Sequence, residues 1–374
     1  MHKTWRAALL LLGLGLSGLV QAALPSFQAL VDAAEPNSLV SPPAGTYAGP
    51  VVIDKPLDID GRGEVTIDGG GRGTVVLIDT DGATVRGLRL VNSGDSHNDI
   101  DAGIQVRGNF NVVKDNVIDH SLFGIDLQQS ENNVVRRNWI SSKKVGLGIR
   151  GDAIRLWYSH GNTVEDNEAV DSRDIVIWYS RDNVIRRNRA TGGRYSMHFM
   201  YSQYNLVEEN DFRGNSVGIY LMYSDGVVVR RNHISHAVGA AGVGIGFKET
   251  SDVRIVDNEI LYCATGLHLD VSPFQPDTIN HISGNLIAYN GIGIQFLNDW
   301  TGNLFENNLI KGNLTQVAVL GGKTARRNQW RGNHWDDYQG FDRDKDGLGD
   351  SAHELYAYAD RLWMDVPQAR FFKG

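Results

Sequence analysis

The chain of 374 residues contains 36 Lys and Arg and 44 Asp and Glu, which gives a formal net charge of −8. This acidic balance argues against a nucleic-acid partner, because phosphate binding needs a basic surface. Cys263 is the single cysteine, so no disulfide can form within the chain. We interpret its thiol as a small buried side chain.

Residues 1–22 have the pattern of a secretory signal peptide. Lys3 and Arg6 precede an apolar stretch at 7–20, which a small-residue cleavage pattern follows. About 14 apolar residues are too few to span a bilayer, and no later segment suits a membrane crossing. We therefore expect a mature protein that begins near Ala23, is soluble, and lies in the periplasm or outside the cell. Losing Lys3 and Arg6 changes the formal net charge from −8 to −10.

The mature chain divides into three predicted regions. Residues 23–50 form an N-terminal cap, in which 25–34 resembles a short amphipathic helix. A repetitive region follows at 51–335, and a C-terminal tail with an Asp-rich loop occupies 336–374. A repetitive fold needs caps at its open ends, because uncovered strand edges pair with other chains.

Pairs of asparagines five positions apart return about every 22 residues through the repetitive region. About eight residues after each pair, a small or polar residue precedes two apolar residues separated by one position, as in Ile175/Ile177 and Ile219/Leu221. This alternation predicts one short strand with a buried face in every repeat. The asparagine pairs are Asn111/Asn116, Asn133/Asn138, Asn162/Asn167, Asn183/Asn188, Asn205/Asn210, Asn280/Asn285, Asn303/Asn308 and Asn328/Asn333, with variants that end at Asn232 and Asn258.

This period predicts an all-β fold, a right-handed parallel β-helix of about ten or more turns that is capped at both ends. The asparagines should form buried hydrogen-bonded ladders between turns. A β-propeller is disfavoured, because its blades need about 40 residues each.

Aligning the repeats also predicts which side chains point outward in line. In the middle turns, one outward line contains Trp157, Trp178, Met200 and Met222, beside His198 and Tyr220, and we call it the central line. At the next position of each repeat, tyrosines should form a further line, at Tyr158, Tyr179, Tyr201 and Tyr223. Three interpretations of the central line stay open: a docking surface for a partner, a surface covered by a loop or the C-terminal tail, and a Cu(I) site, since thioethers and imidazoles suit a soft ion. The candidate Cu(I) ligands are Met200, Met222 and His198, and the candidate partner-binding residues are Trp157, Trp178, Tyr220, Met200 and Met222.

Polysaccharide lyases, epimerases and hydrolases also favour this fold, so a polysaccharide-processing or carbohydrate-binding protein is the alternative function. Glycoside hydrolysis generally needs two carboxylates within about 5 to 9.5 Å. The only acidic residues in the two outward lines are Asp126 and Asp270, which should lie six turns or about 29 Å apart. These two carboxylates are too far apart to act together. An adhesin-like structural solenoid would explain the fold, but it gives no reason for the clustering of Met200, Met222 and His198.

The tail contains alternating carboxylates before Gly347, which is the first half of a calcium-binding loop. The twelfth position of such a loop would be His353, with Glu354 one residue late, so a standard EF-hand is not expected. A Ca²⁺ site and a solvated turn both fit this pattern. The candidate ligands are Asp342, Asp344, Asp346 and Asp350.

Eight motifs, taken in order along the chain, resemble the NosD family of periplasmic accessory proteins for nitrous-oxide reductase maturation. The resemblance covers nearly the whole mature chain, which generic solenoid repeats would not produce. The motifs lie at 151–157 (Gly-Asp-Ala-Ile-Arg-Leu-Trp), 177–180 (Ile-Trp-Tyr-Ser), 194–202 (Arg-Tyr-Ser-Met-His-Phe-Met-Tyr-Ser), 215–224 (Asn-Ser-Val-Gly-Ile-Tyr-Leu-Met-Tyr-Ser), 266–270, 316–319, 335–338 and 340–344.

The resemblance implies a non-catalytic periplasmic scaffold in denitrification. It would act with an ABC-type ATPase and permease and with a copper chaperone to supply the copper centres of nitrous-oxide reductase. It also implies a transient relay of Cu(I). The family pattern transfers no set of copper ligands to this chain, so the assignment of Met200, Met222 and His198 rests on the outward line alone.

Overall fold

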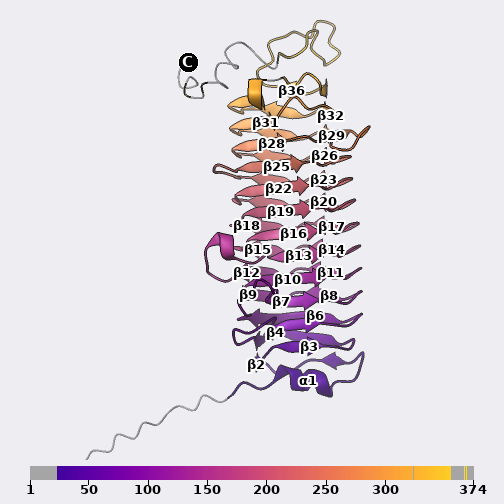
Figure 1. The fold of residues 1–374 in the computed structure, drawn as a ribbon, viewed down its shortest axis with the longest axis vertical. Helices are drawn as coiled ribbons and strands as arrows, with labels where there is room; N and C mark the ends of the chain where they lie inside the picture. The colour runs from indigo at the N-terminus through magenta and orange to yellow at the C-terminus, as the bar shows by residue number, and fades with distance from the viewer. Residues whose placement is uncertain (1–22, 323, 355–365, 367, 369–374) are drawn as a thin grey trace, which may run out of the picture.

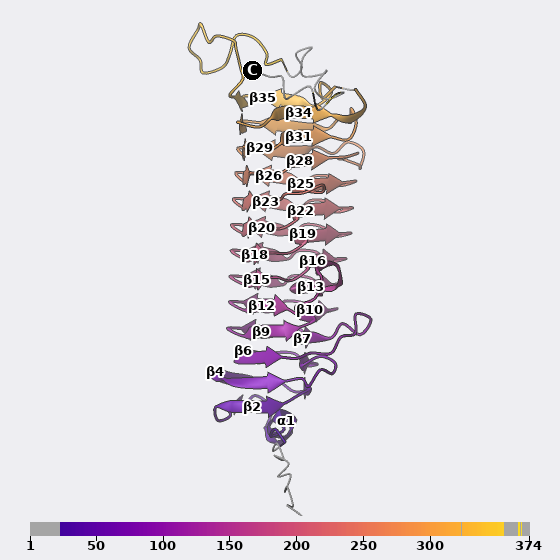
Figure 2. The same cartoon turned by 90° about the vertical axis from the view of Figure 1, so that its left-hand side faces the viewer.

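The computed structural model describes residues 23–322, 324–354, 366 and 368. They form a tall parallel β-solenoid, with short strands stacked turn upon turn along its axis (Figures 1 and 2). This confirms the predicted fold class. The predicted signal peptide at 1–22 lies outside the described residues. None of the helices that the structure describes is long and apolar enough to cross a membrane.

Helix α1 (Phe27–Ala33) covers the N-terminal end, as predicted for this segment. Ser26 is its N-cap and accepts a hydrogen bond from the backbone N–H of Ala29, while Phe27 and Val31 are buried. The region predicted as the cap also contains two strands that pair with β4. The irregular first turns comprise β1 (Leu39–Val40), β2 (Gly45–Ala48), β4 (Asp58–Asp68) and β6 (Thr84–Val91).

Each regular turn contributes one strand to a 12-stranded parallel sheet, which is the face on which the candidate site lies. Parallel pairing in constant register places equivalent repeat positions of successive turns next to each other. The strands are β3 (Val51–Ile53), β5 (Val76–Ile78), β7 (Ala102–Val106), β10 (Phe123–Gln128), β13 (Ile154–Trp157), β16 (Asp174–Trp178), β19 (Tyr195–Met200), β22 (Val217–Met222), β25 (Val243–Lys248), β28 (Thr265–Leu269), β31 (Ile292–Phe296) and β34 (Thr315–Val319).

The other strands of each turn join a 24-stranded sheet that forms the remaining two faces. One face contains β8 (Val112–Lys114), β11 (Val134–Arg136), β14 (Thr163–Glu165), β17 (Val184–Arg186), β20 (Leu206–Glu208), β23 (Val228–Arg230), β26 (Arg254–Val256), β29 (Asn280–Ser283), β32 (Asn303–Glu306) and β35 (Gln329–Arg331). The other contains β9 (Val117–Ser121), β12 (Trp139–Ser142), β15 (Glu168–Val170), β18 (Arg189–Thr191), β21 (Asp211–Arg213), β24 (His233–Ser235), β27 (Glu259–Leu261), β30 (Leu286–Ala288), β33 (Leu309–Lys311) and β36 (His334–Trp335). In the part of the chain that the structure describes, two 3-10 helices, η1 (Leu147–Ile149) and η2 (Leu320–Gly322), interrupt the turns.

The alternating apolar pairs fill the interior of the solenoid. Ile175, Ile177, Ile219 and Leu221 are buried in one continuous core, as their spacing predicts. Cys263 is also buried and free, in agreement with its interpretation as a small core residue.

The asparagines form the predicted ladders, and Asn188 shows the geometry. Its side-chain oxygen accepts hydrogen bonds from the backbone N–H (3.0 Å) and side-chain amide (2.9 Å) of Asn167 on the preceding turn. Its own amide donates to the carbonyl of Val164 (2.9 Å) and to the side-chain oxygen of Asn210 on the next turn (3.0 Å). Each such buried asparagine side chain therefore forms hydrogen bonds with backbone N–H and C=O groups that have no partner in a neighbouring strand.

The small residue before an inward pair is required where the turns approach closely. At Gly218 in β22, a β-carbon would lie 2.1 Å from the carbonyl oxygen of Gly244 and 2.6 Å from the side chain of Ile234. A larger residue would push neighbouring turns apart. This glycine thus permits the stacking on which the alignment of outward side chains depends.

Candidate functional site

Strands β16, β19 and β22 place the central side chains of the outward face in the predicted lines. In one line His198 pairs with Val176 below it and Tyr220 above it. In the second line Met200 pairs with Trp178 below it and Met222 above it. The register therefore brings together the three candidate copper ligands, which lie on two adjacent turns.

The imidazole of His198 reaches across to the next turn and faces Met222. Its Nε2 atom lies 3.4 Å from the Met222 sulfur. Bonds as long as those of zinc sites, about 2.0 Å to nitrogen and 2.3 Å to sulfur, would at a tetrahedral angle separate the two ligand atoms by about 3.5 Å. The two atoms therefore already have the spacing of ligands to one ion. Met200 is their half-buried neighbour, since it lies beside Met222 in register.

Aromatic rings fix the orientation of His198. The Tyr195 ring stacks on it with centroids 4.7 Å apart and an interplanar angle of 20°. Trp178 meets it edge to face at 6.1 Å. Among the described residues, neither His198 Nδ1 nor Trp178 Nε1 has a hydrogen-bond partner, although both atoms are buried. Such orphan polar atoms are uncommon in folded proteins and call for an explanation.

Burial also sets the protonation state of the site. His198 is only 6% exposed, and desolvation lowers its pKa to about 4, against an opposing effect of Asp174 and with help from Arg194 and Arg173. The imidazole is therefore neutral at pH 7 and its lone pair is available to a metal. Burial likewise raises the pKa of Tyr220 to about 12, which keeps this phenol uncharged.

The carboxylates beside the site are engaged by arginines. Arg173 Nε lies 3.0 Å from Asp152 and 3.9 Å from Asp174, while the guanidinium of Arg194 forms a close ion pair with Asp174. Asp174 also accepts a hydrogen bond from the backbone N–H of Tyr195 at 3.0 Å. The spacing of the repeats does not predict that Asp152 and Asp174 belong together, and the structure links them through Arg173.

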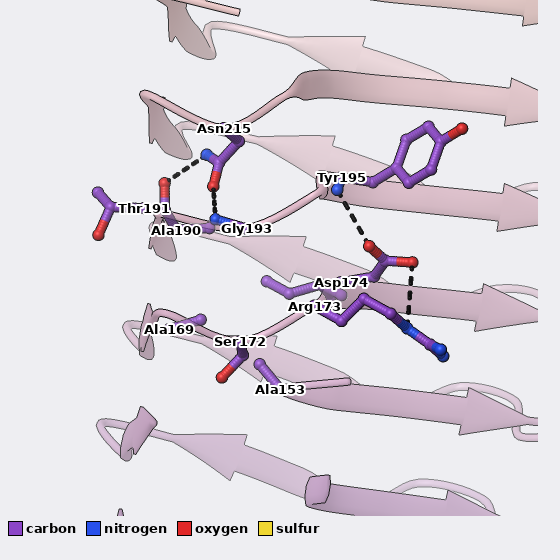
Figure 3. A pocket seen from close by; sticks show the side chains of 11 residues that line it. Ala153, Ala169, Ser172, Arg173, Asp174, Ala190, Thr191, Gly193, Tyr195 and Asn215 are labelled. Carbon is purple, nitrogen blue, oxygen red and sulfur yellow. Dashed lines mark hydrogen bonds and ion pairs between the residues drawn. The ribbon is translucent and has the colours of Figure 1, made fainter. Parts of the chain in front are cut away.

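A small hollow lies behind Asp174 and Tyr195 (Figure 3). Its polar wall is already paired: Gly193 N–H donates to the Asn215 side-chain oxygen at 2.8 Å, and the Asn215 amide donates to the carbonyl of Ala190 at 2.8 Å. Its link to the candidate site is Tyr195, which lines the hollow and stacks on His198.

Four tyrosines, one directly after each of β13, β16, β19 and β22, form a stacked ridge beside the site, as the alignment of the repeats predicts. Their centroid separations are 4.7 Å, 5.2 Å and 4.8 Å along the series Tyr158, Tyr179, Tyr201 and Tyr223. Trp157 touches this ridge edge to face, with centroids 5.3 Å from Tyr179. Tyr158 and Tyr201 are 44% and 43% exposed. The outward face thus presents a continuous aromatic and methionine surface.

The described part of the tail does not cover this surface. Segment 336–354 lies beyond β36 at the C-terminal end of the solenoid (Figure 1). There the His353 ring stacks on Trp335 at 4.3 Å, and the Tyr338 hydroxyl donates to the carbonyl of Ser351 at 2.7 Å. For these tail residues, the interpretation that the tail covers the central line is therefore wrong.

Three of the four candidate calcium ligands come together in the tail. Each of Asp342, Asp344 and Asp346 offers an oxygen, and these atoms lie within 4.8 Å of one another on an exposed loop. The Asp350 side chain instead accepts the backbone N–H of Arg343 at 2.9 Å. His353 Nε2 lies 2.9 Å from the carboxylate of Asp337.

We predict weak Ca²⁺ binding by this loop, with a Kd of about 10⁻³ M, as in open extracellular calcium sites. Asp344→Asn/Asp346→Asn should abolish the binding heat in calorimetry of the mature protein, because it removes two anionic ligands. Glu64→Gln, which removes an exposed carboxylate at the opposite end, should leave the heat unchanged. Equal heats for the double variant and the wild type would show that the Asp-rich loop is a solvated turn.

Comparison with known proteins supports the resemblance found in the sequence. The family described as "Periplasmic copper-binding protein (NosD)" matches residues 147–340, which include β13, β16, β19 and β22. A Pseudomonas aeruginosa protein named "Probable ABC transporter binding protein NosD" is 31% identical over 385 aligned positions, covering 96% of this chain and 87% of its own length. The chain belongs to the NosD family. A Stutzerimonas stutzeri protein of the same name is 37% identical over 95 residues, covering 24% of this chain and 21% of its own length.

Solved structures are similar in fold alone. The A-module of mannuronan C-5 epimerase AlgE6 from Azotobacter vinelandii has a TM-score of 0.60 at 18% identity, covering 83% of this chain and 94% of its own. DFA-IIIase from Arthrobacter chlorophenolicus A6 without its lid has a TM-score of 0.52 at 15% identity, covering 82% of this chain and 91% of its own. At such identities, the shared solenoid carries no information on activity.

Proposed function

We propose that this protein is a non-catalytic periplasmic maturation factor that supports assembly of the copper centres of nitrous-oxide reductase. In this role it handles Cu(I) on the outward face of β19 and β22. The observation that carries the proposal is the 3.4 Å approach of His198 Nε2 to the Met222 sulfur on an aromatic surface. Membership of a family described as periplasmic and copper-binding supports the same role.

The chemistry of the donors suits monovalent copper. Thioethers are soft ligands that favour Cu(I), and imidazole also binds copper. His198, Met200 and Met222 together would offer one nitrogen and two sulfurs without any net charge. A site on the outer face, rather than deep in the core, also suits an ion that must be received and passed on.

The surrounding surface suits protein partners. Interfaces are enriched in Tyr, Trp and Met, and they are depleted of charge at their centre. Trp157, Trp178, Tyr220, Met200 and Met222 provide such a centre, and the tyrosine ridge extends it. In the proposed role this surface meets the copper chaperone and the reductase. An ABC-type ATPase and permease are the membrane partners, a role that the name of the Pseudomonas aeruginosa relative supports.

Anaerobic titration of the mature protein with Cu(I) against a competing chelator tests the proposal. We expect Met200→Ala/Met222→Ala to weaken Cu(I) binding about a hundredfold, or about 2.7 kcal/mol, because His198 alone would remain. Leu297→Ala/Leu320→Ala provides the matched control, since these exposed apolar residues lie later in the same outward line. That control should bind Cu(I) as the wild type does.

Two results would contradict parts of the proposal. Equal affinities of the methionine variant and the wild type would exclude the methionines as ligands. If the wild type alone fails to bind Cu(I), a relay by this chain alone is wrong, and docking of partners would have to account for its function.

A further inference from the structure

Cations of the chain itself already sit on aromatic rings around the candidate copper site. The Arg155 guanidinium lies 4.7 Å from the Trp157 ring centroid, one turn below Trp178. Above, the Lys248 ammonium lies 5.5 Å from the centroid of Tyr223. To one side, the Arg194 guanidinium lies 4.9 Å from the centroid of Tyr195. Electron-rich ring faces on this surface thus repeatedly hold a positive charge.

Trp178 is the indole at the centre of this arrangement, and none of the cation contacts found among the described residues involves it. It lies next to Met200 in register and meets His198 edge to face. The Trp178 ring therefore borders two of the three candidate ligands directly. Indole is the strongest cation–π partner among the side chains.

The Trp178 N–H does not explain why an indole occupies this position. Nε1 is buried and has no hydrogen-bond partner among the described residues. An unpaired buried donor costs about 1–3 kcal/mol, and a phenylalanine would avoid that cost. A favourable interaction of the indole ring would offset the cost of the unpaired N–H, and a cation bound on the ring face would supply such an interaction.

The electrical charge of the site favours a monovalent ion. The candidate ligands are neutral side chains, and Asp174, which accepts the backbone N–H of Tyr195 beside the site, is paired with Arg194. The desolvation cost of an ion grows with the square of its charge, so a dication pays about four times that of a monocation. Zn²⁺ and Cu²⁺ offset this cost with carboxylates, thiolates or several imidazoles.

We propose that Trp178 caps the Cu(I) held by His198, Met200 and Met222 through a cation–π contact, and that this cap makes the site selective for monovalent ions. This inference rests on the proposed function, because it concerns the same site. Trp178 then has two tasks. Its ring stabilises a soft monocation without adding negative charge, and it shields one side of that ion from water.

Trp178→Phe tests the cap, because it keeps an aromatic side chain but weakens the cation–π contact. We expect Cu(I) and the redox-inert Ag(I) to bind this variant about tenfold more weakly in anaerobic chelator competition. Cu(I) should quench part of the tryptophan fluorescence of the wild type, and this quenching should be absent in Trp178→Phe. A hundredfold excess of Zn²⁺ should not displace Cu(I) from the wild type.

Trp139→Phe on β12 is the matched control, since Trp139 belongs to a different face of the solenoid. It should keep both the affinity and the quenching of the wild type. Thermal unfolding of both variants near the wild-type temperature would show that their folds are intact.

The outcomes separate the cap from the proposed function. Equal Cu(I) affinity and quenching in Trp178→Phe and the wild type would overturn the cap, while a loss in Met200→Ala/Met222→Ala would still support the ligand site. Displacement of Cu(I) from the wild type by the hundredfold excess of Zn²⁺ would overturn the selectivity. Absence of Cu(I) binding by the wild type would overturn both the cap and the copper relay by this chain.

Discussion

Replacing Asn188 with alanine should lower the free energy of unfolding by about 4 kcal/mol. The Asn188 side chain makes hydrogen bonds to the turns below and above it. Its loss would leave the backbone N–H of Asn167 and the carbonyl of Val164 buried without a partner. Each such group costs about 1–3 kcal/mol, so two of them account for the expected loss.

Urea unfolding of the mature protein, followed by circular dichroism, measures this effect. Arg189→Ala is the matched control, because Arg189 follows directly in the chain but is exposed, and it should change the free energy of unfolding by less than about 0.5 kcal/mol. Similar stabilities for the two variants would show that water or a local rearrangement satisfies the freed backbone groups. The ladder would then contribute little to stability.

The fold could be predicted because every turn repeats the same physical requirements. Asparagines at fixed spacing mark buried turns, and apolar pairs such as Ile219/Leu221 mark inward strand positions. In a parallel stack, the register transfers this spacing directly to neighbouring turns. The alignment therefore also placed Met200 beside Met222 and His198 beside Tyr220 correctly.

The rest of the site depends on side-chain directions and on one irregularity that the repeat conceals. A register shift between Asp174 and Val176 displaces Tyr195 from the simple alignment, so its stacking on His198 was not predicted. The sequence likewise gave Asp152 and Asp174 no shared role, because Arg173 reaches both from the connecting turn. The spacing of the repeats predicts which residues of successive turns are neighbours, but the side-chain rotamers determine which of their atoms come into contact.

Asp152 should make the protein less stable as the pH rises from 4 to 7. Burial raises its pKa from 3.8 to about 6, with Asp174 adding to the shift and Arg173 opposing it. Because the pKa is higher in the folded state, the proton stabilises that state. This contribution is complete below pH 3.8 and is lost as the pH rises through 6. A shift of about two units corresponds to a loss of about 3 kcal/mol.

Asp152→Asn removes this titration, so its stability relative to the wild type should rise by about 2.4 kcal/mol between pH 4 and pH 7, since part of the loss already occurs below pH 4. Urea midpoints of both proteins at pH 4, 5, 6 and 7 measure the difference. Asp182→Asn is the control, because the Asp182 carboxylate is largely exposed to water in the folded protein, and its curve should run parallel to that of the wild type. A parallel curve for Asp152→Asn as well would mean that Arg173 fully compensates the burial of Asp152. The ion pairs of Asp152 and Asp174 with Arg173 and Arg194 would then hold the elements around His198 in place, and burial of the Asp152 carboxylate would not lower the stability of the protein.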